Sequence, residues 1–307
     1  MRRSIPLPLA IGAVLATLPA TSAQAQESAA AEDMAVIEAE DYAFDAPDEI
    51  PSGWTNIQFE NTGEEPHVLL LTRMPEGRGL EDLELELSPH FIEAWEQVRA
   101  GQVGPDEALA LIGEGAPEWS ADLQYLGGVG IIPEGEAGEV ALDLEPGTYV
   151  IECYMKTEDG DFHSTEGMIR ELEVTEEDSG LAPPEADASL TLTNAGIEVE
   201  GDLTAGRRTV AVTAAEWPDF MFGHNLHLAH EPPLDTEKDE ILDWLNFMGI
   251  EGLIPPAPLE FHGGMNILPP GETGYFTVDL EPGRYMLVSE TAPWGWEDLV
   301  REISVDP

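Results

Sequence analysis

An internal repeat constrains the fold of this chain more than any other feature. Residues 127–149 read GGVGIIPEGEAGEVALDLEPGTY, and residues 263–285 read GGMNILPPGETGYFTVDLEPGRY. The two segments align without gaps at an offset of 136 residues, and 13 of the 23 aligned residues are identical. Self-similarity of this kind is typical of duplicated structural units. We therefore expect the 307 residues to contain two copies of one fold.

Shorter matches extend the repeat in both directions. MIRELEV at 168–174 resembles LVREISV at 299–305. PHVLLLTR also matches GHNLHLAH, which aligns His67 with His224. Between the copies lies a segment rich in proline, alanine and acidic residues, which is the composition of a linker. The predicted organisation is a first domain at 36–175, a linker at 176–189 and a second domain at 190–307.

The pattern within each copy is one of short strands. The first copy contains six apolar-rich or alternating runs separated by glycine, proline and asparagine turns, namely YAFDAPDEI, TNIQFEN, HVLLLTR, GEVALDL, TYVIECY and IRELEV. Helical spacing occurs in SPHFIEAWEQVRAG, where Ser88 is the expected cap and Pro89 the first helical residue, in PDEALALIGEG, and in DTEKDEILDWLNFMG of the second copy. We predict an all-β chain of two tandem Greek-key β-sandwich domains, each with a helical insertion.

The N-terminus has the composition of a secretory signal. Arg2 and Arg3 precede an apolar stretch, and AQA at 23–25 matches an A-x-A cleavage pattern. We therefore expect a signal peptide at 1–25, a flexible tail at 26–35, and export to the periplasm or the cell exterior. The remaining sequence has no apolar run of membrane-spanning length, so we expect no transmembrane segment in the mature chain.

The charge of the chain excludes one class of partner. There are 62 acidic residues against 12 basic ones, which gives a net charge of −50. Nucleic acid is not an expected partner, because phosphate binding needs clustered lysine and arginine. The acids are spread along the whole chain, which favours adaptation to high salt, where screening weakens self-repulsion. A docking face for a cationic partner is the alternative.

Cys153 is the only cysteine in the chain. Exported proteins usually pair their cysteines, so a single thiol needs another role. The chain reads N-x5-H from Asn61 to His67, G-x-Y-x3-C up to Cys153, and H-x4-M from His163 to Met168. This pattern resembles the cupredoxins, β-sandwich proteins that hold type 1 copper. The resemblance implies one mononuclear copper bound by His67, Cys153, His163 and, weakly, Met168. Two imidazoles, a thiolate and a distant thioether are the ligands of electron-transfer copper sites.

The loop between two of these ligands is unusually long. Nine residues separate Cys153 from His163, more than in the small electron carriers of the family. A loop of this length resembles the type 1 site of copper nitrite reductases, which also have two cupredoxin domains. Their catalytic copper needs a histidine immediately before the cysteine and another shortly after the first copper histidine. Here Glu152 precedes Cys153 and Val-Leu-Leu-Leu-Thr follows His67, so we do not expect nitrite reduction.

Each predicted ligand also has a structural interpretation. A lone cysteine can be a small buried hydrophobe, and His163 can be an ordinary loop histidine. His67 can cap a turn. Met168 can belong to the core, because Leu299 occupies the equivalent position in the second copy. The four residues together favour the metal site over these separate roles.

The second copy lacks the ligand set. Ser289 aligns with Cys153, and the loop TAPWGWED contains no histidine. Its own histidines suggest a second metal site at His224, His230 and His262, since imidazole suits copper. A solvated or hydrogen-bonded histidine cluster is the alternative.

The sequence thus predicts an exported cupredoxin-like protein that transfers one electron through a mononuclear copper in its first domain. The redox partner is not identifiable from the sequence. Two other functions stay open: a non-redox binding or assembly module on a degraded cupredoxin scaffold, and copper handling without electron transfer.

Overall fold

The computed structural model describes residues 34–218, 223–231, 238–290 and 300–307. The expected signal peptide at 1–25 and most of the expected tail lie outside the described residues. The loop TAPWGWED and Leu299 lie outside them as well.

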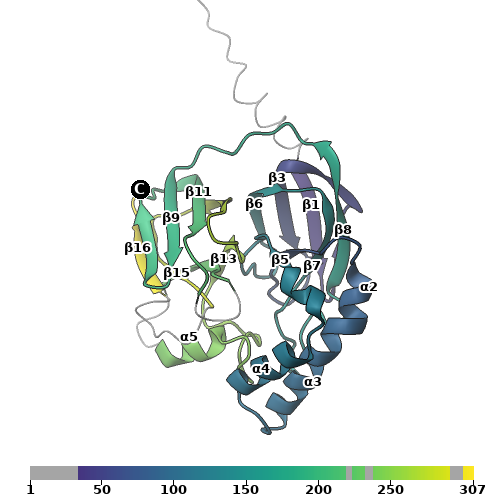
Figure 1. The fold of residues 1–307 in the computed structure, drawn as a ribbon. Helices are drawn as coiled ribbons and strands as arrows, with labels where there is room; N and C mark the ends of the chain where they lie inside the picture. Colours follow the sequence, from purple (N-terminus) through teal and green to yellow (C-terminus); the bar gives the residue numbers. More distant parts are fainter. Residues whose placement is uncertain (1–33, 219–222, 232–237, 291–299) are drawn as a thin grey trace, which may run out of the picture. The chain divides into compact units, whose positions relative to one another are not determined.

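The described residues are mostly β-structure in two sheets, with few helices (Figure 1). The larger sheet has the order β10-β9-β11-β14-β6-β3-β8-β7-β4-β5, and β1 pairs with β2 and β3 beside this path. Its strands are β1 (Met34–Glu40), β2 (Ala43–Asp45), β3 (Glu49–Asn61), β4 (Leu70–Arg73), β5 (Gln124–Tyr125), β6 (Ala137–Leu144), β7 (Gly147–Glu152), β8 (Ile169–Asp178), β9 (Ala188–Thr193), β10 (Gly196–Glu200), β11 (Gly206–Ala214) and β14 (Thr273–Leu280). The smaller sheet, of order β13-β12-β15-β16, consists of β12 (Leu226–His230), β13 (Phe261–Met265), β15 (Gly283–Val288) and β16 (Val300–Val305).

Besides β1, strand β3 pairs with two different strands along its length, β8 and then β6. Its first residues pair in parallel with β8, and from Gly53 onward it pairs antiparallel with β6. The change of partner coincides with a register shift between Pro51 and Ser52 and with the positive φ of 78° at Gly53, which glycine adopts without steric cost. Side chains along β3 alternate between buried and partly exposed, as expected for a strand with one face on a core.

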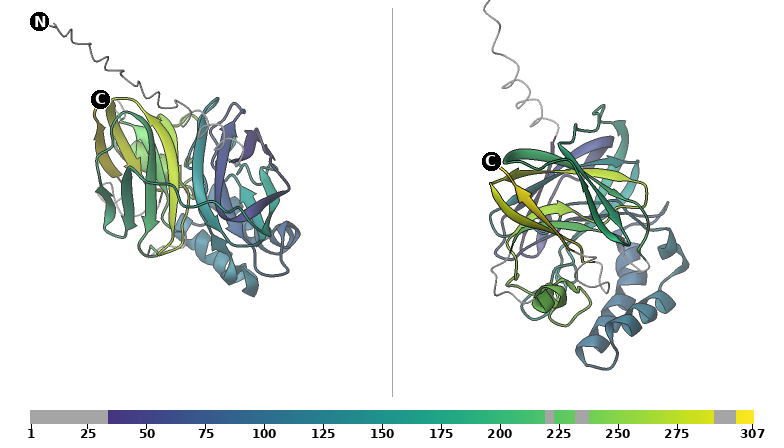
Figure 2. Two further views of the ribbon diagram at one scale, coloured as in Figure 1. Left: turned by 90° about the horizontal axis from the view of Figure 1, so that it is seen from above. Right: turned by 90° about the vertical axis from the view of Figure 1, so that its left-hand side faces the viewer.

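The two sequence repeats pair with each other. Strand β6 of the first repeat and β14 of the second are antiparallel neighbours, with Val140 opposite Phe276. At the repeat offset of 136 residues these two positions are equivalent. This pairing makes the large sheet continuous from one repeat to the other (Figure 2).

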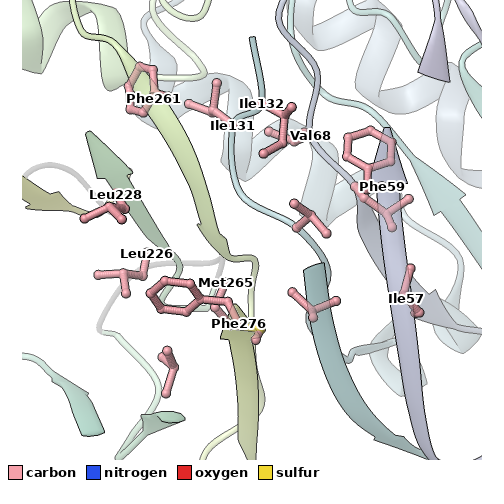
Figure 3. Packing of buried hydrophobic residues seen from close by; sticks show 14 of the residues in the cluster. Ile57, Phe59, Val68, Ile131, Ile132, Leu226, Leu228, Phe261, Met265 and Phe276 are labelled. Atoms are coloured by element: carbon pink, nitrogen blue, oxygen red, sulfur yellow. The ribbon is translucent and has the colours of Figure 1, made fainter. Parts of the chain in front are cut away.

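One hydrophobic cluster draws side chains from both repeats. Ile57 and Phe59 of β3 are fully buried, as are Leu226 of β12 and Met265 of β13. Figure 3 shows these side chains gathering with Val68, Ile131, Ile132, Leu228, Phe261 and Phe276. Ile57, Phe59 and Val68 belong to the apolar-rich runs TNIQFEN and HVLLLTR, from which strands were predicted.

The helical insertion lies between β4 and β5. It consists of α2 (Leu80–Asp82), a π-helical turn η1 (Leu83–Leu87), α3 (Ser88–Arg99), α4 (Pro105–Gly115) and a 3₁₀ turn η2 (Glu118–Asp122). Ser88 is not the cap of α3 as expected, because the preceding turn continues into the helix and Leu87 takes the cap position. Helices α3 and α4 lie side by side (Figures 1 and 2). Trp95 and Val98 of α3 are buried in one cluster with Leu109 and Ile112 of α4.

The second repeat has one described helix, α5 (Lys238–Leu245), within its expected helical segment. None of the helices in the described ranges has both the length and the apolar composition needed to cross a lipid bilayer. Residues 34–307 belong to one compact unit. The predicted division at 36–175, 176–189 and 190–307 therefore stays a prediction, and β8 continues to Asp178, inside the predicted linker.

Candidate metal centre

His67 is positioned by the turn that follows β3. The Asn61 side chain donates to the backbone carbonyls of Glu65 (2.8 Å) and Ile132 (3.0 Å), which fixes the turn. His67 then forms an isolated bridge with Ile132, and its side chain is fully buried. The asparagine of the N-x5-H pattern therefore has a structural role in placing the histidine.

Cys153 and His163 are brought together by a small hairpin. The backbone N–H of His163 donates to Met155 at 2.8 Å, Lys156 bridges to Phe162, and Thr157 N–H donates to Asp161 at 2.9 Å. The nine intervening residues therefore pair with one another instead of forming an open loop. The hairpin turns back on itself, so Cys153 and His163 lie near its base despite their separation in sequence.

The tip of this hairpin is attached to the helical insertion. Trp95 Nε1 of α3 donates to the Gly160 carbonyl at 3.0 Å, and Arg99 donates to the carbonyl of Asp159 at 3.0 Å and to the Asp161 carboxylate. These contacts connect the long Cys153 to His163 loop to the helices that the sequence also predicted in the first repeat.

Three predicted ligands converge. The Nδ1 atoms of His67 and His163 are 3.2 Å apart, and Cys153 Sγ lies 3.8 Å and 3.5 Å from them, respectively. A point equidistant from three atoms at these separations lies about 2.0 Å from each, close to metal–nitrogen bonds of about 2.0 to 2.1 Å and metal–sulfur bonds of about 2.3 Å. All three side chains are fully buried. Among the described residues this is one of two groups whose side chains are close enough to hold a metal ion together.

Met168 is connected to Cys153 and His163 by backbone hydrogen bonds. Its N–H donates to the His163 carbonyl at 2.8 Å, and its carbonyl accepts from Cys153 N–H at 3.1 Å. Its side chain is fully buried. These bonds tie the position of the methionine to two of the three converging residues, while its role as a fourth ligand stays a prediction.

A carboxylate holds the far nitrogen of each histidine. His67 Nε2 is 2.9 Å from Asp41 Oδ1, and His163 Nε2 is 2.8 Å from Glu65 Oε2. When each Nε2–H donates to its carboxylate, each Nδ1 presents a lone pair to the cluster. Two lone pairs then face each other across 3.2 Å. A cation between them resolves this contact, and carboxylate-held histidines are the usual arrangement around protein-bound metals.

Burial sets the protonation of the cluster. Burial raises the pKa of the Cys153 thiol to about 12, although the backbone N–H groups of Val68 and Met155 oppose it. Burial and the neighbouring His67 lower the pKa of His163 to about 3. Burial also lowers the pKa of His67, although its hydrogen bond to the Asp41 carboxylate acts in the opposite direction. The metal-free cluster is therefore neutral, and a metal that binds there must displace the thiol proton.

The chain resembles auracyanins and a multicopper oxidase. An auracyanin of Roseiflexus castenholzii is 18% identical and covers 47% of this chain and 97% of its own, with a TM-score of 0.28. Auracyanin A of Chloroflexus aurantiacus, described as a "blue" copper protein, is 18% identical over 46% of this chain and 99% of its own (TM-score 0.26). A multicopper oxidase is 13% identical over 89% of this chain and 88% of its own (TM-score 0.23).

These likenesses are too distant to assign an activity or a ligand to this chain. No protein-family model matches it, and no curated protein sequence matches it. The resemblance to cupredoxins is instead confirmed by the residues themselves, because the buried His-Cys-His group that it implied is present.

The three histidines suggested for a second metal site do not all lie together. His262 Nε2 is 2.9 Å from His230 Nδ1, and Glu260 Oε2 is 3.4 Å from the same atom. His224 instead lies against Asn194, 3.2 Å from its Oδ1. Two of the three residues suggested for a second metal therefore meet, with Glu260 as the third member of the group, and His224 is not part of it.

The two carboxylates of the first cluster were missed by the sequence reasoning. Asp41 precedes β2 and Glu65 lies in the turn before His67, and both belong to a chain with 62 acidic residues. Only the proximity of Glu65 to His67 offered a signal. Its actual partner, His163, is 98 residues away in the chain.

Proposed function

We propose that this protein transfers single electrons through a mononuclear type 1 copper bound by His67, Cys153 and His163, with Met168 as the weak axial ligand. The observation that carries the proposal is the convergence of two imidazole Nδ1 atoms and one thiol within 3.2 to 3.8 Å of one another. Copper in such a site gains and loses one electron.

The donor set favours copper over metals that prefer oxygen. Two imidazoles and a thiolate are soft or intermediate ligands, which suit copper, whereas magnesium and calcium take carboxylate, carbonyl and water oxygens. The carboxylates of Asp41 and Glu65 contact the histidines and not the centre of the cluster. Their role is to hold each imidazole in the tautomer that presents Nδ1.

Surrounding groups support electron transfer over catalysis at the same atom. Val68 N–H lies 3.4 Å from Cys153 Sγ and donates to it, and hydrogen bonds to the ligating sulfur tune the potential of such copper sites. His67, Cys153, His163 and Met168 are each fully buried. A centre closed by these four side chains leaves no position for a substrate, whereas catalytic metal sites keep one open.

The broader organisation belongs to the same proposal. We infer two tandem cupredoxin-like Greek-key domains, the first with the copper and the second without it. The repeat and the Ser289 that replaces Cys153 support this division. Export, adaptation to high salt and a redox partner outside the cytoplasm are proposed from the N-terminal sequence and the net charge of −50.

Copper handling without electron transfer is the second candidate function. The burial of the cluster favours it less, because a protein that delivers copper must expose its ligands for exchange. A non-redox binding module on the same scaffold is also favoured less, because it would not require the two Nδ1 atoms to face each other.

Metal stoichiometry with ligand variants tests the proposal. The mature protein is titrated with Cu(I) and Cu(II) under anaerobic conditions, alongside Cys153→Ser, His163→Ala and the control His90→Ala, which alters a histidine of α3 outside the cluster. We expect one tightly bound copper in the native protein and the control, and loss of that copper in both ligand variants. Copper binding that persists unchanged in Cys153→Ser and His163→Ala would contradict the site.

A further inference from the structure

A cavity of about 630 Å³ lies directly behind the proposed copper ligands. In an extended chain, neighbouring side chains point to opposite sides. Cys153 points into the cluster, and its neighbours Glu152 and Tyr154 line the cavity. His163 repeats this arrangement, because its neighbours Phe162 and Ser164 also line the cavity. The cavity therefore adjoins the backbone on both sides of Cys153 and His163.

The walls of the cavity are mainly apolar and come from the helical insertion. Leu83 and Leu87 of η1, Phe91 of α3 and Ile112 of α4 form one side, and Leu70 of β4 lies on the other. A volume of this size falls in the range of about 300 to 1,000 Å³ found for small-molecule sites. Ile92, which is 43% exposed, also lines the cavity and marks a rim in contact with solvent.

A buried hydroxyl without a hydrogen-bond partner among the described residues and a half-buried carboxyl group line the same cavity. The hydroxyl is that of Thr72. Glu152 is half-buried and lines this mainly apolar space, as does Tyr125. Buried polar groups normally have partners, so the unpartnered Thr72 hydroxyl calls for a polar group from a ligand, and the Glu152 carboxyl group of the same cavity favours a donor.

Other carboxyl groups of the cavity differ from Glu152. Glu290 Oε2 accepts from Asn225 Nδ2 at 2.9 Å, and its other oxygen lies 2.8 Å from His227 Nε2. Glu84 stands exposed to solvent at the rim. Glu152 is therefore the half-buried acidic group of the cavity, and neither Asn225 nor His227 engages it.

We propose that this cavity binds a small organic cation, an amine carried on an apolar body, with the ammonium group donating to Glu152 and Thr72. The apolar walls accommodate the body, and the charge of −50 on the chain attracts a cation over a neutral or anionic analogue. Because the ligand would lie behind Cys153 and His163, its binding would alter the surroundings of the copper. That second effect rests on the proposed function, whereas the binding itself does not.

Calorimetry with matched probes tests the binding on the full mature chain, first without added copper. The probes are 4-phenylbutylamine, 4-phenylbutanol and 4-phenylbutyrate, which share a body and differ in the head group, and butylamine, which lacks the aromatic body. We expect the phenyl amine to bind at least about tenfold more tightly than the alcohol, the scale of a hydrogen bond to a charged group. The carboxylate and butylamine should not bind measurably.

Three variants locate the site. Glu152→Gln should weaken binding of the phenyl amine about tenfold or more and leave the alcohol unaffected. Leu87→Trp, which fills the cavity and keeps Glu152, should abolish binding of both. Glu177→Gln removes one exposed acid of β8 that does not line the cavity, and it should change nothing. Circular dichroism confirms that each variant is folded.

The outcomes separate this inference from the proposed function. Equal affinity for the three head groups, absence of binding, or an unchanged affinity in Glu152→Gln would overturn the inference. Amine binding by a protein that forms no copper–thiolate absorption band would uphold the cavity and contradict the copper centre. With copper bound, the phenyl amine should shift that band in the native protein and leave it unchanged in Leu87→Trp.

Discussion

Val129 and Met265 occupy equivalent positions in the two sequence repeats, and they are paired with each other in an antiparallel bridge. Backbone hydrogen bonds on the two sides of this bridge are equivalent as well. Gly127 N–H donates to Ile267 at 2.7 Å, and the equivalent Gly263 N–H donates to Ile131 at 2.9 Å. The repeats thus contact each other through the same residues on both sides, as the two subunits of an isologous dimer do.

Both repeats begin with two glycines, and the second glycine of each pair lies close to the backbone of its own repeat. Gly128 and Gly264 have φ values of 131° and 132°. A Cβ atom at Gly128 would lie 2.0 Å from the Leu69 carbonyl oxygen, and one at Gly264 would lie 2.1 Å from that of Leu226. The backbone at Gly128 and Gly264 passes too close to Leu69 and Leu226, respectively, for any side chain.

Gly128→Ala is therefore expected to destabilise the protein by about 2 kcal/mol or more, because it combines a backbone clash with an unfavourable φ. The matched control is Gly113→Ala in α4, where a Cβ meets no atom within 4 Å. Alanine should stabilise that helix by up to about 1 kcal/mol. Thermal and chemical unfolding of both variants provide the measurement, and equal stability of the two would contradict the explanation.

The repeat was visible in the sequence, but the mode of pairing was not. Identity between two segments predicts similar folds and contains no information about which surfaces meet. The alternating pattern of TNIQFEN predicted a strand with one buried face, and β3 has it. In the structure this run and the end of YAFDAPDEI form one strand, β3, which changes partner at Gly53. That continuity depends on β8 and β6, which are distant in sequence.

Glu65→Ala is predicted to weaken copper binding by about 10- to 100-fold, because carboxylates that hold metal-binding histidines contribute on that scale. The carboxylate contacts His163 Nε2 and not the centre of the cluster. Glu64→Ala is the control, since Glu64 is adjacent in the same turn but exposed. Competition with a chelator of known affinity measures the difference. Equal losses in the two variants would show that general negative charge, and not orientation of the imidazole, is responsible.

Lys156 should make stability depend on pH in the alkaline range. Its side chain is buried, its Nζ donates to the Gly249 carbonyl at 2.7 Å, and it lies 4.1 Å from the Trp95 ring. Burial, aided by the charge of Arg99, lowers its pKa from 10.5 to about 7. Desolvation therefore outweighs the attraction of the aromatic ring for the ammonium group.

The sign of the effect follows from proton counting. Between pH 7 and pH 10.5 the unfolded chain holds the Lys156 proton and the folded protein has released it. The free energy of unfolding should then rise with pH, by up to about 1.4 kcal/mol per pH unit for one proton. Lys156→Met lacks this contribution. Denaturation of both proteins at pH 7, 8 and 9 should show curves that diverge in favour of the native protein, whereas parallel curves would contradict the shifted pKa.

The three residues that converge, His67, Cys153 and His163, were all named from the sequence. The only thiol, followed by H-x4-M, limits the chemistry strongly. From the length of the Cys153 to His163 loop it was not predictable whether the loop brings these two residues together. Their proximity depends on pairing within the loop and on hydrogen bonds from α3, such as that of Trp95. Glu152 was identified from the sequence only as a residue that excludes nitrite reductase chemistry. Its place in a cavity depends on the packing of the helical insertion over the hairpin.

The visible spectrum of the copper-loaded mature protein through one reduction and reoxidation cycle tests the central claim most directly. The account predicts an intense thiolate-to-copper band at roughly 600 nm. The band should disappear on addition of one electron per copper, return on reoxidation, and be absent in Cys153→Ser. A protein that binds copper without this band, or whose spectrum is unchanged by Cys153→Ser, would contradict an electron-transfer centre at His67, Cys153 and His163.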